Sequence, residues 1–405
     1  MGNEKRTQIN RSGLIILGIF FLTSGGNAVN SVLQKIIEAF PTVGAATVRM
    51  VSTLPNLTGM GIGLIAGATL GKRLRYRTLY LFGVMAFVIG GVGPALFHDS
   101  LGLILVFRAI FGMSLGAFST CNAYVLSTQP VSMQAKVVGW GAVCTNLGAA
   151  ILQMASGTLA DIYWPYAFWP YASGLVVLIF VRRLKEPAQI NPELSAKQEV
   201  TETKAEKGKL GKRVFLYVGI NFFVMITAVP VMTGMSTLVA DRGLGDSTTV
   251  ALILTICQAG GILTGMILGK FVSVLKRFSM PVALFVQGLG IFGCLAGQNL
   301  AMICIAALVS GIGTILVSSL SATYCGQSTS KETIALATSV LMISTQCANF
   351  LSSYYIVLAQ SLFGSMFRTD VECAYFLSSV LYVIVIILTL VFNVSPKPVD
   401  QNQFA

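Results

Sequence analysis

The stretches "GATLGK" (Gly67–Lys72) and "GMILGK" (Gly265–Lys270) carry the same G-x-x-x-G-K pattern in a chain of 405 residues. A second pair keeps nearly the same offset, because "GMSLGAFSTCNAY" begins at Gly112 and "GIGTILVSSLSATY" begins at Gly311. Both pairs lie at matching places in apolar runs. We infer that the chain contains two copies of one helical unit.

The composition points to a membrane protein. The chain is 55% hydrophobic and 10% charged, with a mean hydropathy of +0.78, whereas about a quarter of the residues in a soluble domain are charged. A helix crosses the membrane with about 20 apolar residues. We predict twelve such spans, near 12–33, 46–70, 78–98, 100–126, 136–160, 164–182, 213–240, 247–272, 279–297, 299–325, 333–360 and 372–394.

The basic residues orient these spans. A cytoplasmic N-terminus places most of the 27 Lys and Arg residues inside, including the loop "KRLRYR" at 72–77, as the positive-inside rule requires. Both termini are therefore predicted to be cytoplasmic, in the inner or plasma membrane of a bacterial-type cell. Topology and anionic lipid explain the net charge of +12, so no nucleic-acid partner is expected.

The apolar pattern stops in the middle of the chain, where "KEPAQINPELSAKQEVTETKAEKGKLGK" occupies 185–212. This composition is typical of a solvated linker. We predict an all-α integral membrane fold with an N-terminal six-helix bundle over 1–182, a cytoplasmic linker over 183–212 and a C-terminal six-helix bundle over 213–405.

The sequence carries no signature of an enzyme or of a cofactor. The eight cysteines lie in or beside apolar spans without a C-x-x-C pair, so we interpret them as free packing residues. No metal, haem or nucleotide motif and no paired-acid or Ser/His constellation is found. We therefore expect no enzymatic activity, no cofactor and no metal site.

A motif in the fourth span suggests a family. In "RAIFGMSLGA", Arg108 and Gly112 form an R-x-x-x-G pattern, and with twelve spans, a six plus six repeat and a polar central loop the chain resembles the major facilitator superfamily of secondary transporters. The loop "GATLGKRLRYR" is similar to the family's G-x-x-x-D-R-x-G-R-R signature, with Gly71 in place of the acid and Leu74 in place of a glycine. The resemblance implies a midplane cavity exposed alternately to either side.

The resemblance also implies that spans one, four, seven and ten line the transport path. In span one, Thr23, Asn27, Asn30 and Gln34 share one face of a regular helix. Polar residues there can equally hold membrane helices together. The residues predicted to bind substrate or to take part in coupling are Arg108, Asn27, Asn30, Arg49, Asn122, Asn146, Gln258, Tyr324, Gln346 and Asn349.

Arg108 and a set of glycines have separate predicted roles. A cation inside a span costs at least about 2.5–3.5 kcal/mol, so Arg108 is expected to face a cavity and to attract an anionic solute or assist coupling. The alternative is an Arg that fixes helices through carbonyl groups. Small residues four apart let helices approach closely, and the predicted gate and packing glycines are Gly67, Gly71, Gly112, Gly265 and Gly269.

These patterns predict a secondary active transporter that moves a small organic solute by alternating access. All fifteen acids lie at span ends or in cytoplasmic segments, which favours organic anions as one solute class. A proton-coupled exporter of drug-like or toxic compounds is the alternative, and a solute sensor with a transporter fold is a third interpretation. Expected partners are the solute, a coupling ion such as the proton, and membrane lipid, with the protein itself a monomer.

Overall fold

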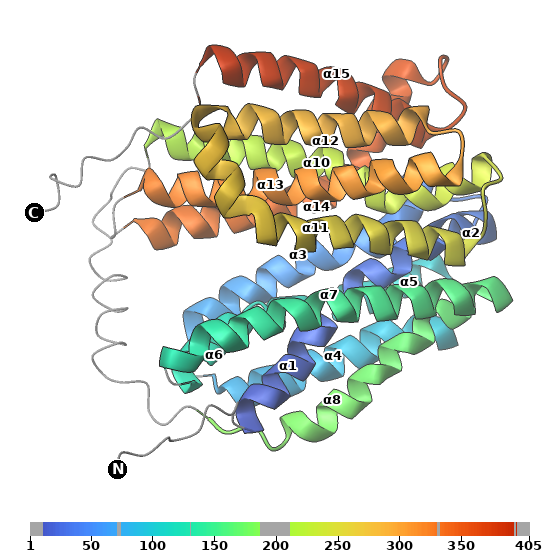
Figure 1. The fold of residues 1–405 in the computed structure, drawn as a ribbon. Coiled ribbons are helices and arrows are strands. Elements are labelled where there is room, and N and C mark those ends of the chain that lie inside the picture. Colours follow the sequence, from blue (N-terminus) through green and yellow to red (C-terminus); the bar gives the residue numbers. More distant parts are fainter. Residues whose placement is uncertain are drawn as a thin grey trace, which may run out of the picture. The chain divides into compact units, whose positions relative to one another are not determined.

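The computed structural model describes residues 11–70, 74–129, 131–186, 211–329, 333–392 and 394. Helices are the regular elements of these residues (Figure 1), with one isolated bridge between Leu70 and Leu74. Contacts divide the chain into two compact units. Unit 1 comprises Met1–Val29 and Leu54–Lys197, and unit 2 comprises Asn30–Thr53 and Gln198–Ala405. The division of the sequence into 1–182, 183–212 and 213–405 stays a prediction.

Three of the predicted spans of the first half are interrupted helices: span one, span four, which breaks after Phe118, and span six. Span one changes to a 3-10 helix at the pair Gly25 and Gly26, since glycine weakens an α-helix, and span six opens with Pro165 and Pro170 in a 3-10 helix. The elements are α1 (Arg11–Thr23), η1 (Gly25–Val32), α2 (Leu33–Ala39), α3 (Ala45–Thr69), α4 (Tyr76–Leu96), α5 (Leu101–Phe118), α6 (Cys121–Thr128), α7 (Val131–Ile162), η2 (Trp164–Ser173) and α8 (Gly174–Val181).

The helices of the second half are long and mostly continuous. Side-chain caps start three of them: Asp246, Asn299 and Thr369 accept hydrogen bonds from backbone N–H groups three residues on, which satisfies donors that a helix leaves free. The elements are α10 (Lys212–Asp241), α11 (Ser247–Leu275), η3 (Lys276–Phe278), α12 (Ser279–Ala296), α13 (Leu300–Gln327), α14 (Ile334–Phe363) and α15 (Asp370–Val391).

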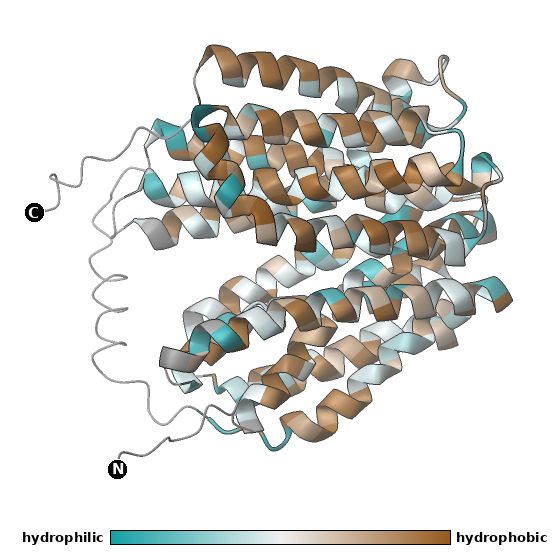
Figure 2. Cartoon of the chain, viewed as in Figure 1, coloured by the Kyte–Doolittle hydropathy of each residue, from teal (hydrophilic) through white to brown (hydrophobic). Residues whose placement is uncertain are grey.

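The all-α membrane fold is confirmed. Each predicted apolar run coincides over most of its length with one or more of these helices, which are apolar along most of their length (Figure 2). Within the described residues, nine stretches are long and apolar enough to span a membrane, and one of them, Ser247–Ala296, contains both α11 and α12. The number of twelve spans stays a prediction.

Glycines set several close helix crossings, and one of these crossings repeats between the units. A Cβ on Gly112 of α5 would overlap the carbonyl oxygen of Pro55 in α3. A Cβ on Gly311 of α13, the matching position of the repeat, would overlap the carbonyl oxygen of Cys257 in α11. Each unit therefore brings two helix backbones into direct contact at the same place.

The repeated G-x-x-x-G-K glycines are not at these crossings. A Cβ on Gly67, Gly265 or Gly269 would meet no atom of the described residues within 4 Å, so the predicted close packing there is not seen in this structure. Gly71 lies outside the described residues. The gating role of all four stays a prediction, whereas Gly112 does occupy a tight crossing.

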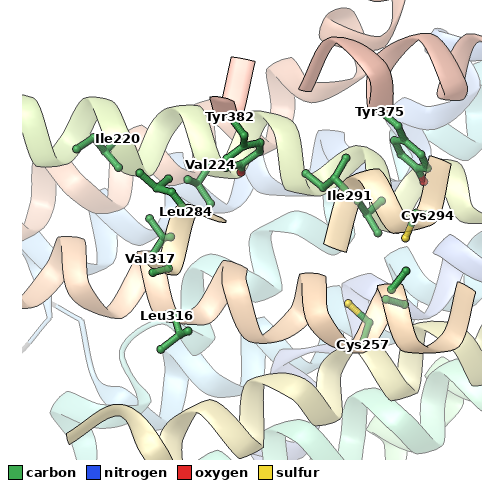
Figure 3. Packing of buried hydrophobic residues seen from close by; sticks show 14 of the residues in the cluster. Ile220, Val224, Cys257, Leu284, Ile291, Cys294, Leu316, Val317, Tyr375 and Tyr382 are labelled. Carbon is green, nitrogen blue, oxygen red and sulfur yellow. The ribbon is translucent and has the colours of Figure 1, made fainter. Parts of the chain in front are cut away.

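The core of unit 2 is an apolar cluster built by α10, α11, α12 and α13 together with α15, which contributes Tyr375 and Tyr382 (Figure 3). Cys257 and Cys294 lie fully inside it. All eight cysteines are free, and these two fill space in the core as small apolar side chains do.

Candidate functional site

A buried ion pair lies at the start of α15. The two terminal nitrogens of Arg49 donate to the two carboxylate oxygens of Asp370, with 3.0 Å from Nη2 to Oδ1, and Nη2 also donates to Thr237 Oγ1 at 3.3 Å. Arg49 is 0% exposed and Asp370 14% exposed. A two-pronged Arg–carboxylate pair is the strongest kind of side-chain ion pair, so Arg49 holds α3 to α10 and α15.

Further polar contacts surround this pair inside unit 2. Ser52 donates to the Oδ1 atom of the predicted site residue Asn30, and the hydroxyls of Thr53 and Ser353 lie 3.1 Å apart. The backbone N–H of Gln34 donates to Ser236 Oγ at 3.2 Å. The segment Asn30–Thr53 belongs to the first half of the sequence but is part of unit 2. Hydrogen bonds and an ion pair bind it to α10, α14 and α15.

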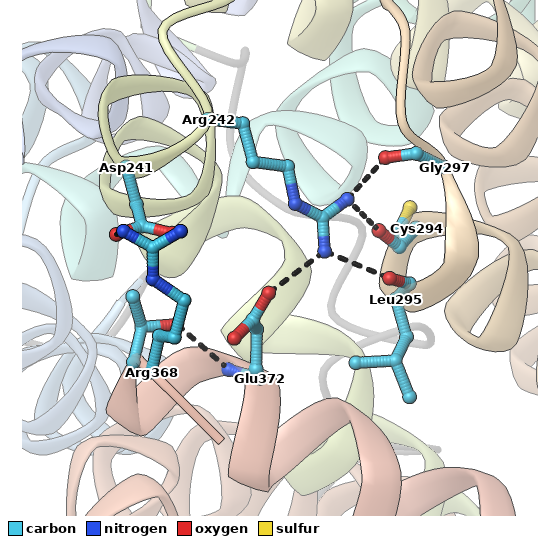
Figure 4. A network of polar contacts seen from close by, with 8 residues as sticks. Asp241, Arg242, Cys294, Leu295, Gly297, Arg368 and Glu372 are labelled. Carbon is cyan, nitrogen blue, oxygen red and sulfur yellow. Dashed lines mark hydrogen bonds and ion pairs between the residues drawn. The ribbon is translucent and has the colours of Figure 1, made fainter.

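A second arginine fixes the same turn of α15. Arg242 donates to the carbonyls of Cys294, Leu295 and Gly297 and to Glu372 at 2.9 Å (Figure 4). Asp370 and Glu372 both occupy the first turn of α15, where a helix favours negative charge. Arg242 thus positions the turn that presents Asp370 to Arg49.

Arg108 lies inside unit 1 among aromatic rings. It is 0% exposed, and its Cζ atom lies 4.3 Å from the ring centroid of Phe111 and 5.5 Å from that of Tyr171. These are cation–π distances. The structure places Arg108 in the interior of the bundle, where a direct contact with solute requires the side chain or its neighbours to move.

The interruption in span one exposes carbonyl groups that side chains satisfy. Tyr171 donates to the carbonyl of Gly25 at 2.8 Å, and Gln153 donates to the carbonyl of Asn27 at 3.3 Å. The side chain of Asn27 itself is exposed. The regular helical face predicted for span one was wrong, since Gly25–Val32 is a 3-10 helix whose turns place side chains every three residues.

A polar seam joins α10 and α14. Asn221 is buried and donates to Thr345 Oγ1 at 2.8 Å, while its own Oδ1 accepts no hydrogen bond from the described residues. The predicted site residues Gln346 and Asn349 follow on α14 and are half-buried. Asn221 therefore contacts α14 through Thr345, and Gln346 and Asn349 lie one and four residues further along the same helix.

The remaining predicted residues lie apart from these clusters. Asn122 is exposed on α6, and Asn146 donates locally to the carbonyl of Ala142 at 2.9 Å. Gln258 is half-buried on α11. Tyr324 is 3% exposed, with its ring 5.5 Å from that of Tyr217, and so packs inside unit 2.

Sequence reasoning missed Asp370 as the partner of Arg49 and missed Gln287. Gln287 is 0% exposed; it donates to Ser310 at 3.3 Å and accepts from Thr314 at 3.0 Å. An amide within an otherwise apolar span was a signal available in the sequence. The pairing of Arg49 with Asp370 had no such signal, because 321 positions separate them.

The fold defines the class of protein: a helical membrane protein with the architecture of a transporter. A family model described as Major Facilitator Superfamily matches residues 15–353 and 241–405. The chain belongs to this family, as its motifs indicated.

A curated relative and several solved structures are similar to the chain. An uncharacterized MFS-type transporter, YuxJ of Bacillus subtilis (strain 168), is 27% identical over 140 residues, which are 32% of this chain and 36% of that protein. The match thus spans about a third of that relative's length.

The solved structures support the fold. The nucleoside transporter NupG has a TM-score of 0.75 at 12% identity, over 95% of this chain and 99% of its own. A bacterial homolog of the human lysosomal transporter Spinster, in an inward-facing conformation, has a TM-score of 0.71 at 16% identity, over 97% of both chains. The inward-open xylose transporter XylE from E. coli has a TM-score of 0.68 at 14% identity, over 93% of this chain and 94% of its own.

Proposed function

We propose that this protein is a secondary active transporter that carries a small organic solute across the membrane by alternating access, acting as a monomer. Membership of the family supports transport. The observation that carries the proposal is the buried pair of Arg49 and Asp370, because it ties the segment Asn30–Thr53 to α10 and α15 by contacts that can be undone. Separation of this pair is the step that frees the segment.

The energetics of a buried ion pair suit a reversible tie. Removal of one partner leaves an uncompensated buried charge and costs about 3–5 kcal/mol. If both partners instead separate into water, each regains its hydration, so the paired and the separated states differ much less in free energy. The pair can therefore hold one state and still yield to a modest input, such as the binding of a solute.

The test uses Ser353→Cys, whose residue is 1% exposed next to Thr53, and a membrane-impermeant maleimide. Asp370→Asn is expected to raise labelling of position 353 several-fold and to reduce transport. The double substitution Arg49→Asp with Asp370→Arg is expected to return labelling to its low parent level and to restore transport. Arg368→Gln is the matched control, because Arg368 is 81% exposed and its pair with Asp241 is long, at 3.9 Å. Labelling and transport unchanged in Asp370→Asn would overturn the proposal.

Organic anions are the solute class that we propose first. Arg108 is fully buried in α5 beside Phe111 and Tyr171, whereas the charge of Arg49 is matched by Asp370. Thermal stabilisation of the purified protein by carboxylates, amino acids, sugars and cationic drugs tests the class, since a ligand that binds the native state stabilises it. Stabilisation by an anion that disappears in Arg108→Ala supports the proposal.

Other outcomes of the thermal-stabilisation experiment would favour the two alternative functions, drug export and solute sensing. Stabilisation by lipophilic cations that is indifferent to Arg108→Ala would support proton-coupled export. A solute that binds tightly and is not accumulated by proteoliposomes would indicate a sensor.

The proposed topology is tested separately. Reporter fusions at residue 200 should lie in the cytoplasm and fusions at residue 99 should lie outside, and the reverse result would invert the orientation.

A further inference from the structure

A groove of about 830 Å³ lies between the start of α1 and the end of α8. All of its lining belongs to unit 1, and none of it takes part in the ion pair or in the polar seam described above. Its volume falls within the range of about 300–1,000 Å³ that is usual for small-molecule sites.

The walls of the groove are apolar. Leu14 on α1 and Phe180 on α8 line it and are 59% and 51% exposed. The two helices are in ordinary packing contact at Gly18, where a Cβ would lie 3.6 Å from the side chain of Val177. From this crossing the helix ends leave a channel between them, and in a membrane protein an exposed apolar channel faces hydrocarbon chains.

The end of the groove is basic and is held in a fixed conformation. Arg183 and Lys185 line it and are exposed, while Leu184 between them is buried. The hydroxyl of Tyr124 donates to the carbonyl of Lys185 at 2.8 Å. These contacts direct the two cationic side chains to the same end of the groove.

The neighbouring acid is already engaged. The carboxylate of Glu186 accepts the backbone N–H groups of Tyr76 and Arg77 at 3.2 and 2.8 Å, and so caps the N-terminus of α4, where negative charge is favourable. The charge left facing the groove is positive.

We propose that this groove binds an anionic phospholipid, with an acyl chain between α1 and α8 and the phosphate against Arg183 and Lys185. Basic pockets between membrane helices on the cytoplasmic side are suited to anionic head groups. A zwitterionic lipid brings the same chain but adds a cation beside two cations, and so binds more weakly. The basic end lies on the side of the membrane that the positive-inside rule makes cytoplasmic.

The test uses Phe180→Trp as a fluorescent reporter in reconstituted protein. Brominated phosphatidylglycerol is expected to quench Trp fluorescence at position 180 more strongly than brominated phosphatidylcholine, after subtraction of the parent protein's signal. Arg183→Gln with Lys185→Gln should weaken the apparent affinity for phosphatidylglycerol on the order of tenfold. Arg182→Gln is the matched control, because Arg182 is exposed beside them and does not line the groove.

Either of two results would overturn the proposal. Equal quenching by the two lipids, or quenching unaffected by the double substitution, would mean that bulk lipid fills the groove without recognition. Relief of quenching by free glycerol phosphate at concentrations similar to those of the lipid would show that the head group alone binds and that the acyl channel contributes nothing.

Discussion

Unit 1 and unit 2 have the same helix crossings and different interiors. Gly112 in one and Gly311 in the other bring two backbones together at matching positions. Yet Arg108 of unit 1 corresponds to Ala307 of unit 2, and both are fully buried. Spans one, four and six of the first half are interrupted, whereas α10, α13 and α15 are continuous. The two units therefore share a tight crossing and place different residues, Arg108 and Ala307, four positions before it.

The largest expected effect comes from the shared crossings. Gly112→Ala and Gly311→Ala each place a methyl group on the backbone of the adjoining helix, so both should cost at least the roughly 1–3 kcal/mol typical of overpacking. Size-exclusion profiles and thermal unfolding in detergent measure the loss. Gly67→Ala and Gly265→Ala, where a Cβ meets open space, are the controls. A severe loss in only one of the two crossings would show that the halves do not pack alike.

The second prediction concerns Arg108, whose corresponding residue in unit 2 is the uncharged Ala307. Arg108→Met keeps the volume of the stem and removes the charge, and such replacements often leave a fold as stable or more so. Transport should fall on the order of tenfold, equivalent to about 1.4 kcal/mol, with little change in unfolding temperature. Arg108→Lys should recover part of the activity, because lysine keeps the charge without the planar stacking. Full transport by Arg108→Met would assign Arg108 a purely structural role.

A smaller difference is expected between two tyrosines with corresponding roles. Tyr171 donates to the carbonyl of Gly25 at 2.8 Å, and Tyr375 donates to that of Pro230 at 3.3 Å. The Gly25 carbonyl lies in an interrupted helix, so Tyr171→Phe should cost about 1 kcal/mol. Tyr375→Phe should cost less, since the Pro230 carbonyl lies within continuous α10. Thermal unfolding of both variants measures the difference, and the reverse order would contradict it.

The smallest expected effect is at Gln287, which bonds to Ser310 and Thr314 in unit 2. Polar contacts between membrane helices average about 0.6 kcal/mol and reach about 1.7. Gln287→Leu should therefore lower the stability of unit 2 only slightly, as read by hydrogen exchange in α12 and α13. A loss above about 2 kcal/mol would make this network a main support of the unit.

Hydropathy predicted the positions of the helices because a span must be apolar over its whole length. It could not predict the interruption at Gly25, since the period of polar residues from Thr23 to Gln34 continues through it. Tyr171 and Gln153, far along the chain, donate to the carbonyls of Gly25 and Asn27 in this stretch, and such partners are not visible in the local sequence.

The candidate site was predictable only in part. Arg49 and Asn30 were identified as polar residues in apolar spans, but their partners were not, because a single sequence does not record which distant residues meet. Arg108 was identified by the cost of burying its charge, and the aromatic rings around it come from the tertiary structure.

The segment Asn30–Thr53 is made of two parts. It begins in the 3-10 stretch Gly25–Val32, contains α2, turns over 40–44, and ends in α3 two positions before Pro55, which removes a backbone hydrogen bond from that helix. The part in α3 is held by Arg49 with Asp370, and the part in α2 is held by the backbone N–H of Gln34 on Ser236. Separation of the ion pair would therefore free the α3 part first, while the α2 part stays bound.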